Sequence, residues 1–181
     1  MMTLSDARKI LAEAEPLCSA AEVTQAVDRL AAEITRALSE KNPLALIVMS
    51  GAAIFAGQLL TRLAFPLELD YLHLTRYGNT TRGGKLEWKK EPPPVAGRVV
   101  LVIDDVLDEG DTLAEIRRRL LADGAQAVYG AVFADKEIGR PKPAAADFVG
   151  IKLPNRYVFG FGMDVRGAWR NLPAIYALRE E

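Results

Sequence analysis

Apolar residues follow two patterns that alternate along the chain, short continuous runs and repeats at helical spacing. Residues 44–49, 99–103 and 128–134 are apolar runs, which are typical of strands buried on both faces of a sheet. Residues 67–76 predict another strand. Helices are predicted over residues 5–15, 19–38, a stretch carrying Phe55, Leu59 and Leu63, and 112–123 with Leu113, Ile116, Leu120 and Leu121 facing inward. Strands that alternate with helices predict an α/β fold, a parallel β-sheet flanked by helices.

The first two predicted helices carry different capping signals. Ser5 is a candidate N-cap for the helix over 5–15. Ser19 and Glu22 have the spacing of a capping box, in which each side chain bonds the other residue's backbone N–H. The apolar face of this second helix consists of Val23, Val27, Leu30, Ile34 and Leu38. We interpret both helices as scaffold.

Composition excludes several classes of function. The chain has 181 residues, half of them hydrophobic and 26% charged, as expected of a single globular domain spanning 1–181. A net charge of −1 gives no support to nucleic-acid or membrane-surface binding. Cys18 is the only cysteine, so no internal disulfide can form. We expect a cytoplasmic protein without a membrane span. His73, the only histidine, lies within a predicted strand, which favours a structural role.

One segment, Val99–Thr112, combines several chemical signals. Its apolar strand is followed by Asp104 and Asp105, then by an acidic loop containing Gly110, and a helix opens near Thr112. A helix start offers unpaired N–H groups and a positive dipole end to a phosphate, while carboxylates suit sugar hydroxyls or a metal. Together these features suit a phosphorylated sugar. A buried strand that ends in acids is also common in α/β proteins that bind other ligands.

The same segment resembles the phosphoribosyl-diphosphate (PRPP) motif of type I phosphoribosyltransferases: an apolar strand, two acids, then Asp-x-Gly-x-Thr. The resemblance implies that Asp104 and Asp105 orient the ribose hydroxyls, directly or through Mg²⁺, and that Asp108 is the catalytic acid/base. It also implies that the PRPP phosphate and ribose are bound by Asp104, Asp105, Asp108, Glu109, Gly110, Asp111 and Thr112. Asp111 stands where many members carry a lysine, and we expect its side chain to point away from the phosphate.

Two further loops match positions that this family uses. Ser50 and Gly51 follow the strand 44–49 and fall in the loop that binds pyrophosphate. Ser50 replaces a frequent lysine, which leaves open whether the family's cis peptide, at Met49–Ser50 here, is present. Residues 77–90 correspond to a mobile loop that begins near Tyr77 and closes over PRPP to exclude water. Arg76 replaces the serine that usually precedes this tyrosine.

The last third of the chain resembles the purine-binding hood of hypoxanthine-guanine phosphoribosyltransferases. Lys136 lies twelve residues before Phe148-Val149-Gly150, as the family's purine-binding lysine does. The resemblance implies a hood over residues 136–175, with about 1–40 as N-terminal helices. The implied purine-binding residues are Lys136 on the 6-oxo group, Tyr157 by stacking, Val158 by its backbone, and Asp164. Asp164 would also join Asp104 and Asp105 as a metal ligand, and Arg170 would join Ser50 and Gly51 on pyrophosphate.

The function implied is purine salvage: transfer of the phosphoribosyl group of PRPP to hypoxanthine or guanine, with Mg²⁺ as cofactor. Lys136 as a donor disfavours adenine, whose 6-amino group is itself a donor. Two alternatives stay open, a xanthine-preferring enzyme and a PRPP- or nucleotide-sensing regulator on the same fold. The resemblance further implies a homodimer or homotetramer, for which apolar residues on the early helices are available.

Overall fold

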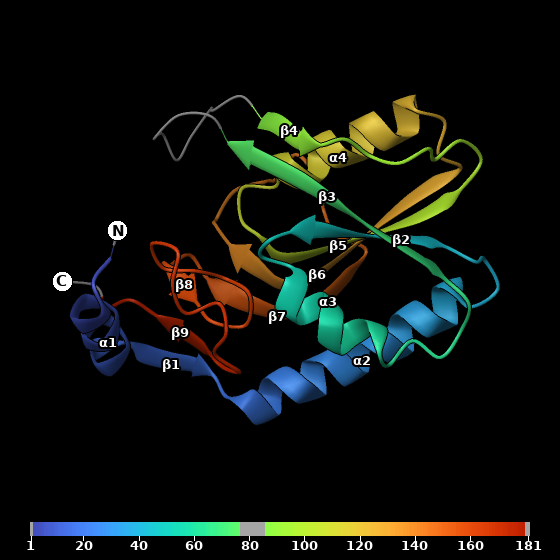
Figure 1. Cartoon of the computed structure of the whole chain (residues 1–181). Coiled ribbons are helices and arrows are strands. Elements are labelled where there is room, and N and C mark those ends of the chain that lie inside the picture. Colours follow the sequence, from blue (N-terminus) through green and yellow to red (C-terminus); the bar gives the residue numbers. More distant parts are fainter. Residues whose placement is uncertain (1, 77–85, 180–181) are drawn as a thin grey trace.

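The central element of the computed structural model, which describes residues 2–76 and 86–179, is a six-stranded sheet (Figure 1). In the order β4-β3-β2-β5-β6-β7, its strands are β2 (Leu44–Met49), β3 (Glu68–Arg76), β4 (Leu86–Lys90), β5 (Val99–Leu107), β6 (Ala127–Glu137) and β7 (Phe148–Pro154). Neighbouring strands pair in parallel, except that β4 pairs antiparallel with β3 at one edge. The predicted parallel sheet is confirmed, with one antiparallel edge strand.

Helices cover both faces of this sheet, as expected for a buried parallel sheet. The apolar side chains of α2 (Ala20–Leu38) and α3 (Ala53–Leu60) share one buried cluster with alternate residues of β2, β5 and β6. Those of α4 (Asp111–Ala122) share a second cluster, which includes the other alternate residues of β2 and β5. Figure 1 shows α4 on the opposite side of the sheet from α2 and α3. The predicted α2 face is confirmed, since Val23, Val27, Leu30, Ile34 and Leu38 are all buried. Among the described residues, no helix is long and apolar enough to cross a membrane.

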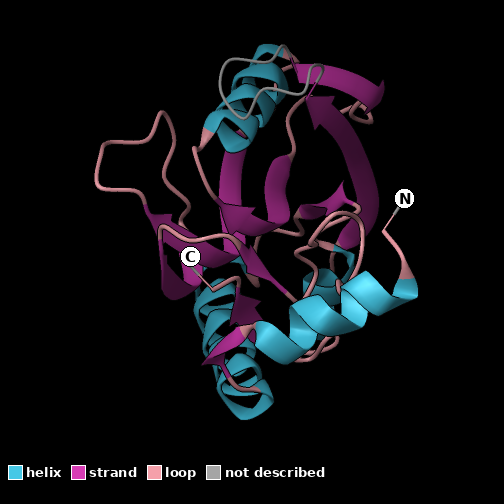
Figure 2. Ribbon diagram, turned by 90° about the vertical axis from the view of Figure 1, so that its left-hand side faces the viewer, coloured by secondary structure: helices cyan, strands magenta, loops and turns pink. Residues whose placement is uncertain are grey.

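A second, antiparallel sheet of three strands draws on both ends of the chain. It consists of β1 (Glu15–Cys18), β9 (Ile175–Ala177) and β8 (Val158–Phe159), in that order. Together with the loops of residues 160–174, this sheet forms the hood, which lies beside the carboxyl ends of the central strands (Figures 1 and 2). The N-terminal segment therefore contributes a strand to the hood, in addition to α1 (Leu4–Glu13) and α2.

The N-cap of α1 is Thr3, so the expectation of Ser5 was wrong. The Thr3 hydroxyl accepts a hydrogen bond from the Asp6 backbone N–H, and the Asp6 carboxylate accepts one from the Thr3 N–H. This capping box needs an acceptor three residues after the cap. Ser5 is followed at that spacing by Arg8, which has no acceptor to return the bond. The second capping box, Ser19 with Glu22, is confirmed.

Two central strands extend further than their apolar runs predict. β5 continues to Leu107, so that Asp104 and Asp105 lie within the strand, and β6 continues to Glu137. Pairing between the two strands keeps these residues in extended conformation, because Val106 pairs with Ala134 and Leu107 with Asp135. One inward-facing prediction for α4 was wrong: Leu121 is 53% exposed, because the stripe facing the sheet is narrow and is filled by Leu113, Ile116 and Leu120.

Candidate active site

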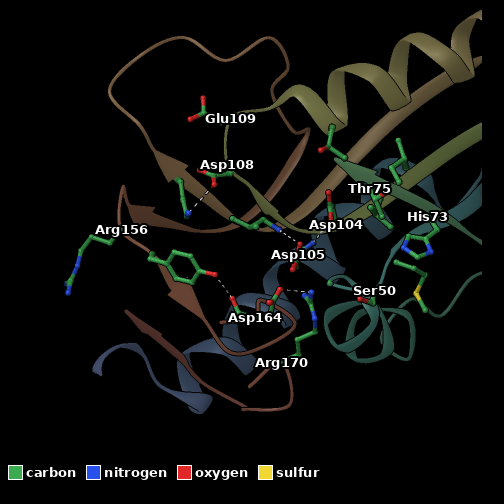
Figure 3. A pocket seen from close by; sticks show the side chains of 18 of the residues that line it. Ser50, His73, Thr75, Asp104, Asp105, Asp108, Glu109, Arg156, Asp164 and Arg170 are labelled. Atoms are coloured by element: carbon green, nitrogen blue, oxygen red, sulfur yellow. Dashed lines mark hydrogen bonds and ion pairs between the residues drawn. The ribbon is translucent and has the colours of Figure 1, made fainter. Parts of the chain in front are cut away.

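An open cleft of about 800 Å³ lies between the carboxyl ends of the central strands and the hood (Figure 3). Most of the site residues that the sequence predicts line it. These are Ser50, Gly51, Asp104, Asp105, Asp108, Glu109, Thr112, Lys136, Tyr157, Asp164 and Arg170. They come from two strands, one helix start and four loops, so the fold gathers residues that are up to 120 positions apart in sequence.

The floor of the cleft is formed where the turn after β2 meets β5. The Met49–Ser50 peptide bond is cis, as the family resemblance implies. At Gly51 the backbone approaches β5 so closely that a Cβ atom would lie 2.3 Å from Asp105 Oδ2. Only glycine permits this approach. The Gly51 backbone and the Asp105 carboxylate therefore occupy one compact position at the end of the sheet.

Two adjacent carboxyl groups share this floor. Asp105 is buried and Asp104 is partly exposed to the cleft. Desolvation, followed by the charge of Asp105, raises the pKa of Asp104 well above its usual value. Desolvation also raises the pKa of Asp105, although the Val106 N–H and the Arg170 guanidinium oppose that rise. The pair thus has an unfavourable excess of negative charge, which a bound cation would relieve.

The start of α4 forms the side of the cleft at the end of β5. The N-cap residue, Gly110, has a φ of +89°, and no side chain caps the helix. The first-turn N–H groups are therefore not used by a capping side chain, and Thr112 in that turn lines the cleft. Backbone donors, the helix dipole and a hydroxyl together suit a phosphate.

Asp108 and Lys136 face each other at the ends of β5 and β6. Lys136 Nζ lies 3.2 Å from Asp108 Oδ2, shown as a dashed line beside Asp108 in Figure 3. The lysine side chain is only 12% exposed, whereas that of the aspartate is 49% exposed. A shielded cation and a more accessible carboxylate thus form one donor–acceptor pair at the edge of the cleft.

The hood contributes an ion pair and an aromatic ring. Arg170 lies 2.5 Å from Asp164 Oδ1 and donates to the Gly162 carbonyl oxygen at 2.6 Å (Figure 3). The other Asp164 oxygen accepts the Gly167 N–H at 2.7 Å. Tyr157 is half-exposed, and its hydroxyl donates to the Asp164 carbonyl oxygen at 3.3 Å. The predicted stacking residue and the predicted pyrophosphate residue are therefore both held against Asp164.

Other predicted residues lie outside the cleft lining or outside the described residues. Gly110, Asp111 and Val158 are absent from the lining, and their proposed backbone roles stay predictions. Tyr77 lies outside the described residues, as does most of the loop 77–90, of which 86–90 form β4.

Sequence reasoning missed part of the cleft lining, namely His73, Thr75, Asn155 and Arg156 (Figure 3). His73 pairs in register with Met49, at the carboxyl end of β2, so the structural role favoured for it does not describe its position fully. The available signal was that neighbouring parallel strands end at the same edge of a sheet.

The carboxylates of the floor fit one mode of magnesium binding. Among residues 2–76 and 86–179, no group of three or more His, Cys, Asp or Glu side chains forms a ready-made metal cage. Mg²⁺ is commonly held by one or two carboxylates together with substrate phosphates. Asp104 and Asp105 fit that mode, and their raised pKa values indicate the charge that a cation would offset. Asp164, the third predicted ligand, is paired with Arg170.

Comparison with known proteins agrees with this arrangement. Residues 17–166 match the model of the phosphoribosyl transferase domain family. The hypoxanthine-guanine phosphoribosyltransferase of Streptococcus pneumoniae is 31% identical, with 99% of this chain and 98% of that protein covered. The hypoxanthine-guanine-xanthine phosphoribosyltransferase of Tritrichomonas foetus is 34% identical, with 88% of each covered. A hypoxanthine phosphoribosyltransferase structure from Staphylococcus aureus superposes with a TM-score of 0.87 at 27% identity, covering 94% of this chain and 95% of that one. The chain therefore belongs to the hypoxanthine-guanine phosphoribosyltransferases.

Proposed function

We propose that this protein transfers the 5-phosphoribosyl group of PRPP to hypoxanthine or guanine, giving IMP or GMP and pyrophosphate, in cytoplasmic purine salvage. The observation that carries the proposal is the Asp108–Lys136 pair, with its 3.2 Å separation. In a 6-oxopurine, N7 and the 6-oxo oxygen lie on the same edge of the ring. A carboxylate beside an ammonium group at this spacing matches a proton at N7 and an acceptor at the 6-oxo oxygen.

The purine end of the cleft then has three roles for its side chains. Lys136 donates to the 6-oxo oxygen, which favours hypoxanthine and guanine over adenine. Asp108 accepts the N7 proton as N9 bonds to C1 of the ribose and pyrophosphate departs, so that the base is uncharged in the product. Tyr157 is half-exposed at the mouth of the cleft, where its ring is available to stack on the base.

The opposite end of the cleft holds the phosphorylated sugar. The uncapped first turn of α4 and Thr112 bind the 5′-phosphate, while Asp104 and Asp105 orient the ribose hydroxyls. The backbone at Ser50–Gly51 and the Arg170 guanidinium bind pyrophosphate. As the C1–O bond to pyrophosphate breaks, positive charge develops on the sugar, and the buried carboxylates of β5 stabilise it by charge.

Mg²⁺ is the proposed cofactor. Asp104 and Asp105 would hold it together with oxygens of PRPP, and Asp164 is a further candidate ligand on the hood. When bound, the ion neutralises charge on the pyrophosphate leaving group.

The test measures pyrophosphate release from PRPP and Mg²⁺ with hypoxanthine, guanine, xanthine and adenine. We expect turnover with 6-oxopurines and none with adenine. Asp108→Asn should lower kcat by at least about tenfold, because the proton acceptor is lost. Lys136→Met should raise the KM for the purine. Lys152→Met, at an exposed position of β7, should change neither constant.

Two results would redirect the proposal. Turnover of xanthine together with hypoxanthine and guanine would match the name of the Tritrichomonas foetus relative, and preferential turnover of xanthine would identify a xanthine-preferring enzyme. Saturable PRPP binding with no turnover of any base would contradict the enzyme and favour a PRPP-sensing regulator. In that case, RNA and DNA binding that weakens steeply with salt would identify a nucleic-acid partner.

We further propose that the protein is a homodimer or homotetramer. Leu69 and Tyr71 are 56% and 45% exposed on the same face of β3, and Ile54 on α3 is 37% exposed. Large apolar side chains exposed on neighbouring elements are typical of association surfaces. Sedimentation of the wild type and of a Leu69→Lys/Tyr71→Lys variant tests this, since a shift toward monomer is expected for the variant. An unchanged mass would place the interface elsewhere.

A further inference from the structure

The loop between β6 and β7 folds back against the phosphate-binding loop. We call residues 138–146 of this loop the strap; they contain neither helix nor strand. A Cβ atom at Gly110 would lie 3.1 Å from Lys142 Cβ, 3.2 Å from Pro143 Cδ and 3.3 Å from the Ala144 carbonyl oxygen. Arg140 of the strap forms an ion pair with Glu109. The strap therefore contacts two successive residues of the loop between β5 and α4.

One side chain of the strap, that of Lys142, forms hydrogen bonds with both β5 and β6. Lys142 Nζ donates to the Leu107 carbonyl oxygen at 2.6 Å and to Asp135 Oδ1 at 2.5 Å. Its side chain is only 12% exposed. A shielded ammonium group with two oxygen partners forms strong, directional hydrogen bonds, and each partner would lose its bond if the charge were removed.

The two partners of Lys142 each lie one residue before a member of the Asp108–Lys136 pair. Leu107 is the last residue of β5 and immediately precedes Asp108, whereas Asp135 immediately precedes Lys136. Leu107 and Asp135 also pair in register across the two strands. Lys142 thus links the backbone of Leu107, the residue before Asp108, to the side chain of Asp135, the residue before Lys136. The separation of Asp108 and Lys136 depends on the relative position of these two strand ends.

A purely structural salt bridge would explain the burial but not this location. The matched lysine on the neighbouring strand, Lys152, pairs with Glu137 at 3.4 Å and is 69% exposed. That exposed pair contributes little. Lys142 differs in being shielded, in bonding two strands rather than one, and in doing so one residue before both members of the catalytic pair.

We propose that Lys142 is a positioning residue, which holds the ends of β5 and β6 so that Asp108 and Lys136 meet the N7/6-oxo edge of the purine together. The proposal rests on the proposed function for the identity of the ligand. It adds a residue of the strap, none of whose residues lines the cleft. Catalysis is sensitive to such support, because small displacements of reacting groups cost large factors in rate.

The test compares Lys142→Met with Lys152→Met. Methionine retains the Cβ that contacts Gly110, so PRPP binding should stay within about twofold of wild type. The kcat/KM for hypoxanthine should fall by about tenfold, and IMP binding measured by calorimetry should weaken several-fold. Lys142→Arg, which retains a donor and the charge, should recover much of the loss. Lys152→Met should match the wild type in all three measurements.

A second variant, Asp135→Asn, tests the same contact from the other side, in case Lys142→Met fails to fold. Asp135→Asn keeps the Leu107 bond and should produce a smaller change in the same direction. Combined with Lys142→Met, it should add less than its separate effect, because both substitutions break one contact. Kinetic constants within twofold of wild type for Lys142→Met would overturn the proposal, as would equal losses for PRPP and for the purine. If the wild type turned over no base, the proposed function would fail, while the IMP-binding comparison would still judge the role of Lys142.

Discussion

The two ends of the cleft are built in different ways. The end proposed to bind PRPP comes mainly from one continuous segment, Val99–Thr112, which supplies a buried strand, two carboxylates and a helix start. The hood is assembled from segments that lie more than 130 residues apart, since β1 pairs with β9 and β9 with β8. A contiguous segment can be recognised from local pattern, whereas the hood exists only after the chain has folded.

Hydrogen bonds from the hood back to the N-terminus show how long-range this assembly is. Trp169 Nε1 donates to the Ala7 carbonyl oxygen at 2.8 Å, next to Arg170. Arg156, beside Tyr157, pairs with Glu15 at 2.8 Å and donates to the Leu178 carbonyl oxygen at 2.9 Å. Substitutions far from the cleft in sequence should therefore affect the hood residues Tyr157 and Arg170. The part of the cleft built from Val99–Thr112 should respond mainly to substitutions within or directly against that segment.

The largest effect is expected at the close contact on the floor of the cleft. Gly51→Ala would place a methyl group 2.3 Å from Asp105 Oδ2, so the turn or the carboxylate must move. We expect kcat/KM for PRPP to fall by about 100-fold or more. Gly57→Ala, in α3, is the matched control, because a Cβ atom added at Gly57 would have no neighbouring atom within 4 Å. It should leave activity unchanged and stabilise the fold by about 0.5–1 kcal/mol. Equal activities of the two variants would contradict the contact.

A second prediction separates stability from activity at Asp104. Because its pKa is raised in the fold, this carboxyl binds its proton more tightly there than in the unfolded chain. The contribution of Asp104 to folding stability is therefore most favourable below the pKa that it has in the unfolded chain. This contribution is lost as the pH rises through the raised pKa of the folded state. At neutral pH, Asp104→Asn should raise the Tm by roughly 2–4 °C. Activity should fall at the same time, because the proposed ligand of the ribose and of Mg²⁺ is lost.

Asp70 provides the control of opposite sign. Its hydrogen bonds with Lys90 and the Tyr71 N–H lower the pKa of this carboxyl. The contribution of Asp70 to folding stability is thus present above the pKa that it has in the unfolded chain, and it is lost as the pH falls through the lowered pKa of the folded state. Asp70→Asn should lower the Tm at neutral pH and have less effect in acid, without change in kcat. Thermal melts of both variants between pH 3 and 8 measure the contrast, and parallel curves would show that the raised pKa of Asp104 has no consequence for folding.

A third, smaller effect tests the link between the hood and α1. Trp169→Phe keeps an aromatic ring but removes the donor to Ala7, at a cost of about 1 kcal/mol. Because Arg170 is the next residue, the affinity for pyrophosphate should weaken a few-fold. Trp88→Phe, on β4, serves as the control and should leave pyrophosphate affinity unchanged. Calorimetric titration with pyrophosphate compares the two, and an equal response would remove the proposed link.

The smallest effect is expected at the Ser19 capping box of α2. Ser19→Ala removes the acceptor for the Glu22 N–H and should lower the free energy of unfolding by about 1 kcal/mol. Neither the KM for PRPP nor that for the purine should change, since α2 packs against the sheet away from the cleft. Denaturant unfolding and steady-state kinetics test both statements. A change in KM would indicate that the start of α2, next to β1, also supports the hood.

The sequence by itself determined the features that depend on neighbouring residues. The apolar run 44–49 coincides with β2, the Ser19–Glu22 box begins α2 one residue later, and the buried face of α2 follows its 3.6-residue period. The motif over Val99–Thr112 predicted residues that line one end of the cleft, because its carboxylates and helix start are adjacent in the chain. Short-range hydrogen bonding and periodic burial produce these features, so they can be read locally.

Tertiary structure alone decided the pairings between distant segments. The sequence named Asp108 and Lys136 separately, but their 3.2 Å contact follows from the register of β5 on β6. Neither β1 in the hood nor His73 at the cleft was predicted, because each depends on which strand lies beside it. No local pattern distinguishes Lys142, whose bonds to the Leu107 carbonyl oxygen and to Asp135 exist only in the folded chain. Strand pairing and loop packing depend on contacts across the whole chain, which no local pattern encodes.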